Sequence, residues 1–476
     1  MRVFVFIVVL LFVLTDAVSG QPSTDSFDAF DYSRRLGLGV NLGNALEAPQ
    51  EGDWGLELEP WHFESIAEGG FDSVRVPIRW SAHAEETAPF EIDEQFFERI
   101  DWVIDQANSN GLAVIVNMHH YDELFQDVEG HTDRFVAMWN QIATRYQDHS
   151  TTNLYFEFLN EPNTAFTHLR WREVFEKTLH EVRRTNPDRM VIVGGINWNS
   201  VTELSRLQLP EDDRNLIGTF HYYDPFRFTH QGAEWVGNSD GWLGTTWEGT
   251  ETERNIVMRD FQLATRWSDR KNRPVYVGEF GAYRRADMES RARWTAFVRE
   301  TALQRGFSSA YWEFGAGFGV MNRGSREWIE PLYQALAPTP LFDLDGVDGI
   351  NLSDLDLLAD SISAGSTSLR FDLDGNGSVE TRDLYFWLFF TDNRMADSNL
   401  DGNVDFSDFL TLTERYGEMA NWSEGDFDAD GLVTFSDFLL LSTNYDGTST
   451  VSVPEPTRLF WPGLLLLAYL LRRRWR

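Results

Sequence analysis

In the stretch Leu-Tyr-Phe-Glu-Phe-Leu-Asn-Glu-Pro, residues 154–162, a largely apolar run ends directly before the polar pair Asn160 and Glu161. Short runs rich in aromatic and aliphatic residues predict buried β-strands. The stretch Val-Tyr-Val-Gly-Glu-Phe-Gly, residues 275–281, has the same form and also carries a glutamate near its end. An ionisable group at the end of an apolar strand costs free energy unless it is paired or functional. These two stretches therefore predict two buried strands whose ends bring carboxylates together in one site.

Outward from these stretches, residues 30–337 alternate short apolar runs with longer helical patterns. Eight strand–helix units over ~300 residues predict an α/β fold, a (β/α)8 TIM barrel. A doubly wound sheet has the same alternation, but no glycine-rich phosphate loop follows the first strand. The predicted strands are Gly37–Leu42, Ser73–Ile78, Ala113–Met118, Leu154–Leu159, Met190–Gly194, Leu216–His221, Val275–Glu279 and Ser309–Phe314. The predicted helices include Glu94–Ser109, Arg134–Gln147, Trp171–Thr185, Ile256–Lys271 and Ser290–Arg305.

Polar and aromatic residues lie in or directly after six of the eight predicted strands. In a barrel of this kind, the reacting groups lie at the C-terminal ends of the strands. We therefore expect these side chains to converge on one mouth. They are Arg75, His119, His120, Asn160, Glu161, His221, Tyr223, Glu279 and Trp312.

Glu161 and Glu279, taken as a pair, fit the hydrolysis of an acetal. One carboxyl group protonates the leaving oxygen and the other attacks the anomeric carbon, and a separation of roughly 5–5.5 Å gives retention whereas ~6.5–9.5 Å gives inversion. The sequence leaves that distance open. One alternative is a metal-dependent hydrolase that uses His119, His120 and His221. Another is a non-catalytic polysaccharide-binding or scaffold protein of the cell surface, which has no use for the paired carboxylates.

The order Arg75, His119, Asn160-Glu161, His221-x-Tyr223, Glu279 and Trp312 resembles glycoside hydrolase family 5. The strings at 39–49, 230–235 and 312–319 are similar to its bacterial branch of endoglucanases and mannanases. The resemblance covers nearly all of residues 30–337 and implies a retaining endo-β-1,4-glycanase that needs no cofactor for catalysis. Its substrate would be β-glucan, with mannan as a second possibility. It implies Glu161 as acid/base, Glu279 as nucleophile, Arg75, His119, Asn160, His221, Tyr223 and Trp312 as supporting residues, and Asn44, Glu47, His120 and Trp235 as substrate contacts.

The chemistry of these residues adds expectations of its own. Arg75 and Tyr223 can hold Glu279 ionised by charge and hydrogen bonding, and His221 can position Glu161. Neighbours on a strand point to opposite faces, so His120 either faces the cleft or packs behind the barrel. The segment 222–252 is expected to form one wall of the cleft. Glucan or mannan preference and endo or exo action stay open.

A twelve-residue pattern recurs after Pro340. Oxygen ligands at positions 1, 3, 5, 9 and 12 with glycine at 6 are what a calcium loop requires. A copy from Asp343 to Asp354 lacks the ligand at 5 and the glycine at 6, so we expect weak binding or none there. The three intact copies predict structural Ca2+, with candidate ligands Asp372, Asp374, Asn376, Ser378, Glu380 and Asp383; Asp397, Asn399, Asp401, Asn403, Asp405 and Asp408; and Asp426, Asp428, Asp430, Leu432, Thr434 and Asp437.

The repeats at 341–447 resemble dockerin type I modules. The resemblance implies a small helical domain of EF-hand-like loops that docks onto a cohesin. Positions 10 and 11 vary between the copies, and a calcium-stiffened stalk explains the pattern equally well. The segment 341–450 holds 23 acidic residues against 4 arginines, and the chain carries a net charge of −35. Such a charge argues against nucleic acid as a partner.

Both ends of the chain carry targeting patterns. Arg2, the apolar run 3–14 and small residues up to Gly20 predict a signal peptide over 1–20, with an uncleaved anchor as the alternative. Val-Pro-Glu-Pro at 453–456, an apolar run at 459–471 and an arginine cluster resemble a PEP-CTERM sorting tail over 453–476. That tail implies an exosortase-type processing enzyme and a secreted or outer-surface location in a bacterium. A simple membrane anchor is the alternative. The chain has no cysteine, which excludes disulfides and thiol chemistry.

Overall fold

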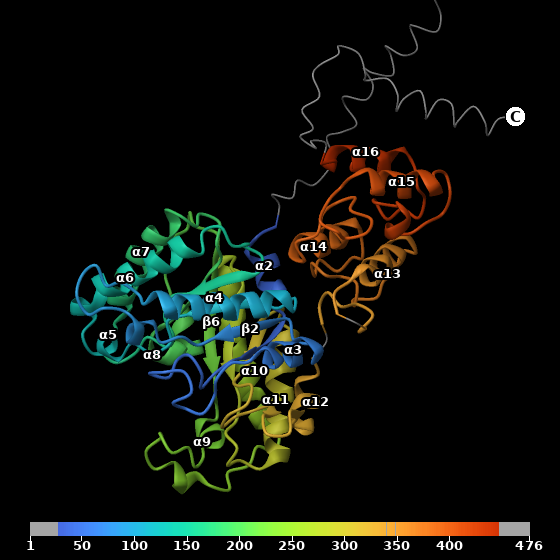
Figure 1. Cartoon of the computed structure of the whole chain (residues 1–476). Coiled ribbons are helices and arrows are strands. Elements are labelled where there is room, and N and C mark those ends of the chain that lie inside the picture. Colours follow the sequence, from blue (N-terminus) through green and yellow to red (C-terminus); the bar gives the residue numbers. More distant parts are fainter. Residues whose placement is uncertain (1–26, 339, 348, 447–476) are drawn as a thin grey trace, which may run out of the picture.

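The structure is a computed structural model that describes residues 27–338, 340–347 and 349–446. A barrel of strands wrapped by helices makes up most of it, and a bundle of four helices adjoins one end of the barrel (Figure 1). The predicted signal peptide and the predicted sorting tail lie outside the described residues. Within the described part, no helix has both the length and the apolar character that crossing a membrane requires.

The predicted (β/α)8 barrel is confirmed. Each strand pairs in parallel with the next one along the chain, and β8 pairs with β1 to close the barrel. All eight predicted strands are present, with ends that differ from the prediction by at most three residues. They are β1 (Leu38–Asn41), β2 (Ser73–Val76), β3 (Ala113–Asn117), β4 (Leu154–Glu157), β5 (Val191–Gly194), β6 (Leu216–Tyr222), β7 (Val275–Phe280) and β8 (Ser308–Tyr311).

Side-chain caps fix where the barrel helices begin. The Asp93 side chain accepts a hydrogen bond from Gln95 N, so the helix begins at Glu94 as predicted. The next long helix begins at Val128 rather than at Arg134, because Asp127 caps it by accepting from Gly130 N. The helices are α2 (Ala29–Arg35), α3 (Pro60–Glu68), α4 (Glu94–Ser109), α5 (Asp122–Gln126), α6 (Val128–Arg145), α7 (His168–Arg183), α8 (Ile196–Asn199), α9 (Phe226–Thr229), α10 (Glu251–Lys271), α11 (Met288–Leu303) and α12 (Glu330–Leu336).

The four helices after the barrel each begin at position 10 of one copy of the repeat. The aspartate at position 12 is buried and closes a capping box with the residue at position 9 in every copy. We call residues 341–446 the C-terminal module. Its helices are α13 (Leu352–Ser363), α14 (Thr381–Phe390), α15 (Phe406–Arg415) and α16 (Phe435–Asn444).

Two large apolar clusters hold the protein together. One contains strand residues such as Val74 and Val114 packed with residues of the surrounding helices. The other contains Ile115 and Tyr155, which alternate with that first set along the strands and so face the barrel interior. This second cluster continues through Tyr32 of α2 into the C-terminal module. The barrel interior and the module therefore share one core.

Candidate active site

Arg75, on β2, is fully buried and contacts two carboxylates at the C-terminal mouth of the barrel. Its Nε and Nη2 donate to Glu157 at 2.6 and 2.8 Å, and its Nη1 donates to Glu279 at 2.7 Å. Nη1 and Nη2 of Arg75 also donate to the side-chain oxygens of Asn41 and Asn160, respectively, both at 2.8 Å. Glu157 and Asn41 were not among the residues that the sequence singled out. A carboxylate inside the apolar run of β4 was the one available signal for Glu157.

Glu279 lies on β7 and is held at both carboxylate oxygens. Arg75 donates to Oε1, and the hydroxyl of Tyr223 donates to Oε2 at 2.9 Å. Burial raises the pKa of Glu279 from its usual 4.5, while His221, Arg75 and the Tyr223 hydrogen bond lower it. The contacts that we expected to keep Glu279 ionised are therefore present, but they offset the effect of burial only in part.

Glu161 follows β4 and has a φ of 49°, in the left-handed region that non-glycine residues rarely adopt. Its Oε1 lies 2.8 Å from Nδ1 of His221. The side-chain amide nitrogen of Asn199 lies 3.4 Å from the other ring nitrogen of His221. Burial raises the pKa of Glu161 to about 7 and lowers the pKa of His221 to about 4. Near neutral pH, an uncharged His221 thus positions a carboxyl group that can still carry its proton.

The two glutamates lie close together. One oxygen of Glu161, one oxygen of Glu279 and a ring nitrogen of His221 are all within 4.8 Å of one another. In the described part of the chain, His119 and His120 belong to no such cluster, so the three-histidine arrangement of the metal-dependent alternative is not formed. The arrangement is instead two carboxylates that share one histidine.

Trp312 and His119 form a flat wall beside the carboxylates. Their rings stack at 5.6 Å with an interplanar angle of 8°, and both line the cleft that contains Glu161 and Glu279. Gly43 lies so close to the indole that a Cβ there would approach it to 2.9 Å. His120 lines the same cleft, with its ring 4.8 Å from that of His119. Of the two positions left open for His120, the structure places it facing the cleft.

The other residues predicted to contact substrate also line this cleft. Glu47 is buried, and its carboxylate accepts hydrogen bonds from the backbone amides of Asn44 and Ala45. Trp235, in the segment that we expected to form a wall, has 62% of its surface exposed and lies edge-on to Tyr283 at 5.0 Å. His230 and Phe318 lie in the strings that carry the resemblance but were not named as contacts, and four other lining residues come from loops whose course no pattern predicts: Trp54, Tyr283, Arg284 and Arg323.

A second hollow continues from the cleft on the side of Glu161. It shares His120, Asn160 and Glu161 with the cleft and is also lined by Trp198, which is 59% exposed. Asn197, Trp198 and Asn199 all have positive φ values, between 51° and 57°. Three consecutive non-glycine residues in this region indicate a strained backbone, which is commonly held in place at functional sites. The second hollow and the main cleft therefore each contain an exposed tryptophan, Trp198 and Trp235 respectively.

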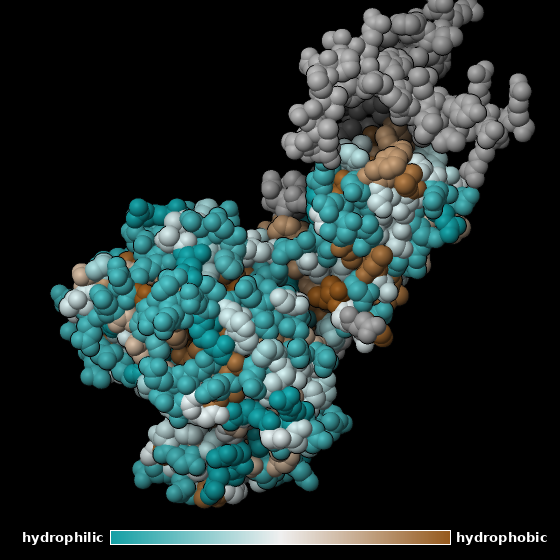
Figure 2. Space-filling model, viewed as in Figure 1, coloured by the Kyte–Doolittle hydropathy of each residue, from teal (hydrophilic) through white to brown (hydrophobic). Residues whose placement is uncertain are grey.

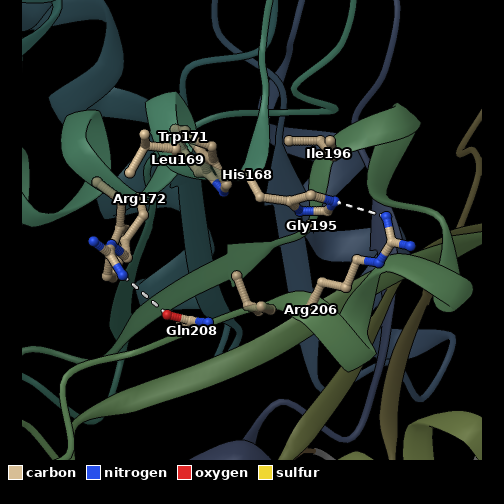
Figure 3. A pocket seen from close by; sticks show the side chains of 10 residues that line it. His168, Leu169, Trp171, Arg172, Gly195, Ile196, Arg206 and Gln208 are labelled. Carbon is tan, nitrogen blue, oxygen red and sulfur yellow. Dashed lines mark hydrogen bonds between the residues drawn. The ribbon is translucent and has the colours of Figure 1, made fainter.

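A third pocket lies outside the cleft, beside α7 and the end of β5 (Figure 3). Arg172 donates to Gln208 at 3.0 Å across it, and Arg206 lies 3.3 Å from His168. It shares no lining residue with the cleft. We assign it no part in the chemistry of Glu161 and Glu279.

Paired carboxylates at the C-terminal mouth of a closed parallel barrel, beside a wall of aromatic rings, are typical of glycoside hydrolases. The comparison with known families makes this assignment narrower. The chain belongs to glycosyl hydrolase family 5, the cellulase family, whose model matches residues 46–317.

Individual relatives agree with the family. Endoglucanase H of Acetivibrio thermocellus is 40% identical over 323 residues, which are 66% of this chain and 34% of that protein. Cel5A of Thermotoga maritima, solved with mannotriose and also with cellobiose, is 46% identical with a TM-score of 0.64. Each of these matches covers 65% of this chain, and the mannotriose complex is matched over 100% of its own chain. The chain spans about a third of endoglucanase H and two fifths of the next curated relative, the cellulase/esterase CelE of A. thermocellus.

Proposed function

We propose that this chain is a retaining endo-β-1,4-glycanase that cuts β-glucan and also accepts β-mannan. The observation that carries the proposal is the spacing of Glu161 and Glu279, whose nearest oxygens lie within 4.8 Å while both contact His221. Retaining enzymes separate their two carboxyl groups by roughly 5–5.5 Å, and inverting enzymes need ~6.5–9.5 Å to admit a water molecule. The close spacing therefore favours direct attack by one glutamate.

In the first step, Glu279 attacks the anomeric carbon while the bond to the leaving oxygen breaks and Glu161 gives that oxygen its proton. In the second step, water gives a proton to Glu161 and attacks the same carbon, which frees Glu279. Glu161 suits the acid role because its pKa is raised to about 7 by burial. Glu279 suits the nucleophile role because Arg75 lies 2.7 Å from it and opposes protonation.

The shape of the cleft supports cutting within a chain. The leaving group of the sugar must lie on the side of Glu161, where the second hollow and Trp198 are found. Trp235 lies in the main cleft, outside that hollow. Exposed aromatic rings supply large flat contact areas for ligands. A substrate that continues past the cleavage point into the second hollow would therefore contact Trp198, while the rest of it would lie in the main cleft with Trp235.

Mannan is included in the proposal because Cel5A of T. maritima was solved with mannotriose as well as with cellobiose. The test compares wild-type protein with Glu279→Gln on carboxymethylcellulose, glucomannan and xylan, measuring reducing sugar. We expect release from the first two polymers and loss of activity in the variant. Proton NMR of the first product checks retention. An inverted product, or a folded protein without activity on any of the polymers, would contradict the proposal.

The C-terminal module is proposed to hold structural Ca2+. In each intact copy, Oδ2 of the first aspartate accepts a hydrogen bond from the amide of the position-6 glycine, which keeps the loop closed. Oδ1 of Asp372 is buried and receives no hydrogen bond from the described residues. Asp372, Asp374 and Asp383 converge there, and a buried carboxylate oxygen without a donor fits a hard cation. Asp343, Asp345 and Asp354 also converge, so weak binding by the first copy stays a prediction based on Val347.

Export and surface sorting remain our proposal from residues 1–20 and 453–476, with an exosortase-type enzyme as processing partner.

We also propose a protein partner of the cohesin type, and the residues that support it lie on α15 and α16. Apolar residues are scattered among hydrophilic ones on the visible face of the module, whereas the visible face of the barrel is mostly hydrophilic (Figure 2). Phe406 and Leu410 on α15 match Phe435 and Leu439 on α16, and all four are exposed. Binding of a purified cohesin with and without Ca2+ distinguishes this docking role from a plain stalk.

A further inference from the structure

The C-terminal module packs against the base of the barrel, the end opposite the cleft. Phe27, just before α2, lies 4.9 to 5.6 Å from three phenylalanine rings of α14. Asp392, which follows α14 in the module, accepts hydrogen bonds from Thr152 and Asn153, which precede β4 in the barrel. Leu341 N donates to Asp72, which precedes β2, at 2.7 Å. Apolar contacts and hydrogen bonds thus join the two parts.

One calcium-type loop of the module, residues 372–383, lies in this interface. The Arg34 side chain of α2 donates to the backbone carbonyls of Asp372 and Leu373. A Cβ at Gly375, the fourth loop position, would collide with the same guanidinium. The amides of Leu373 and of the next residue donate to Asp383 on the inner side of the loop. The start of this loop is therefore held between an arginine of the barrel and the last candidate ligand.

A second arginine ties the loop to the same helix. Arg382, at position 11, contacts Asp374 of the loop and lies 3.3 Å from Asp31 of α2. The corresponding residues of the other two intact copies are Ser407 and Ser436, which carry no charge. Among the described residues, the loops at 397–408 and 426–437 make no hydrogen bond or ion pair with the barrel. The three intact copies of the repeat are therefore not equivalent.

We infer that the 372–383 loop is a cation site that couples the C-terminal module to the barrel, so that Ca2+ bound there stabilises the barrel itself. The inference rests on the calcium part of the proposed function. Its support is the unpartnered, buried Oδ1 of Asp372 together with the Arg34 contacts to the same residue. A cation that gathers Asp372, Asp374 and Asp383 fixes the carbonyls that Arg34 binds. Any ligand that binds only the folded loop adds its binding free energy to the stability of everything that unfolds with the loop.

The experiment measures thermal unfolding of the full chain by calorimetry, in Ca2+ and in EDTA. The barrel transition is identified by the temperature at which hydrolytic activity is lost. Ca2+ at a hundred times its dissociation constant should raise the Tm of that transition by about 5 °C. Asp372→Asn should remove most of this shift. The matched control is Asp426→Asn, which changes position 1 of a loop that makes no hydrogen bond or ion pair with the barrel and should reduce the shift much less than Asp372→Asn does.

Variants of Arg34 distinguish the coupling of the loop to the barrel from the binding of Ca2+ itself. Arg34→Ala should reduce the Tm shift while calorimetric titration still counts the same number of Ca2+ ions. Arg34→Lys keeps the charge but cannot donate to both carbonyls in the same way, and it serves if the alanine variant does not fold. If Ca2+ binds and the barrel Tm does not move, or if Asp372→Asn and Asp426→Asn behave alike, the coupling is wrong. If titration detects no Ca2+ binding, the calcium proposal and the coupling are wrong together, while the glycanase assay is unaffected.

Discussion

Glu157 is the residue whose replacement tests the site network most sharply. It is buried, and its two oxygens receive hydrogen bonds from Arg75 at 2.6 and 2.8 Å. In Glu157→Gln, one carbonyl oxygen can keep one of these bonds, but the new amide group points a donor at the guanidinium. Arg75 is fully buried and would retain Glu279 as its one close carboxylate.

Breaking a buried ion pair by removing one partner costs ~3–5 kcal/mol, because the remaining charge stays buried. For a barrel of this size, that loss corresponds to a fall in Tm of roughly 6–10 °C. The assay is thermal or urea unfolding followed by tryptophan fluorescence. The matched control is Asp101→Asn. Asp101 binds Arg145 through both oxygens at 2.5 to 3.1 Å, but both side chains are about a quarter or more exposed.

Exposed pairs contribute ~0–1 kcal/mol, so the control should unfold within about 2 °C of wild type. Should Glu157→Gln and Asp101→Asn lose equal stability, the reasoning from burial fails. Glu157→Gln also has a second readout. The charge of Glu157 raises the pKa of Glu161, so its removal should shift the alkaline limb of the kcat/KM profile to lower pH. A shift to higher pH would show that the network transmits the opposite effect.

Three further predictions concern the chemistry. Because Glu161 must be protonated to act as acid and its pKa is about 7, kcat/KM should fall roughly tenfold per pH unit above that value, and Glu161→Gln should lack this limb. Tyr223→Phe removes the hydrogen bond at 2.9 Å to Glu279 and should lower kcat by about tenfold or more, with an unchanged Tm in calorimetry; equal kcat would mean that the bond is not used. Trp198→Ala should raise KM for long oligosaccharides more than for short ones, because the ring lies on the leaving-group side of Glu161; equal effects on both would place it outside the substrate path.

Much of the barrel could be predicted from the sequence, because buried parallel strands are apolar runs. The polar residues that end these runs stand out against them. The same logic exposed Glu161 and Glu279. Glu157 was harder to recognise. Its partner Arg75 is far away in sequence, so nothing near Glu157 distinguishes it from an ordinary structural glutamate. Asn41 and Asn199 gave no signal, because their roles depend on contacts with Arg75 and His221 that only the closed barrel creates.

The packing of the module could not be predicted either. The repeats indicated their own internal structure, with a helix after each loop, because capping and ligand positions are local. Their contact with the barrel depends on Arg34, Phe27 and Asp392, which are ordinary residues in the sequence and become informative only as neighbours. That loop differed visibly from the other intact copies at positions 10 and 11, Thr381 and Arg382, but nothing in the sequence connected these differences with the barrel.

The placement of the module has a consequence for work on solid substrates. Both described ends of the chain lie on the base side of the barrel: Phe27 contacts α14, and Asp446 pairs with Arg394 within the module that packs against the base. The cleft opens at the C-terminal ends of the strands, at the other end of the barrel. In Figure 1 the module lies above the barrel, while α9, which follows β6, lies at the lower end. Tethering through either described end would leave the mouth pointing outward, so anchorage and access to a bulky polymer would not compete for the same surface.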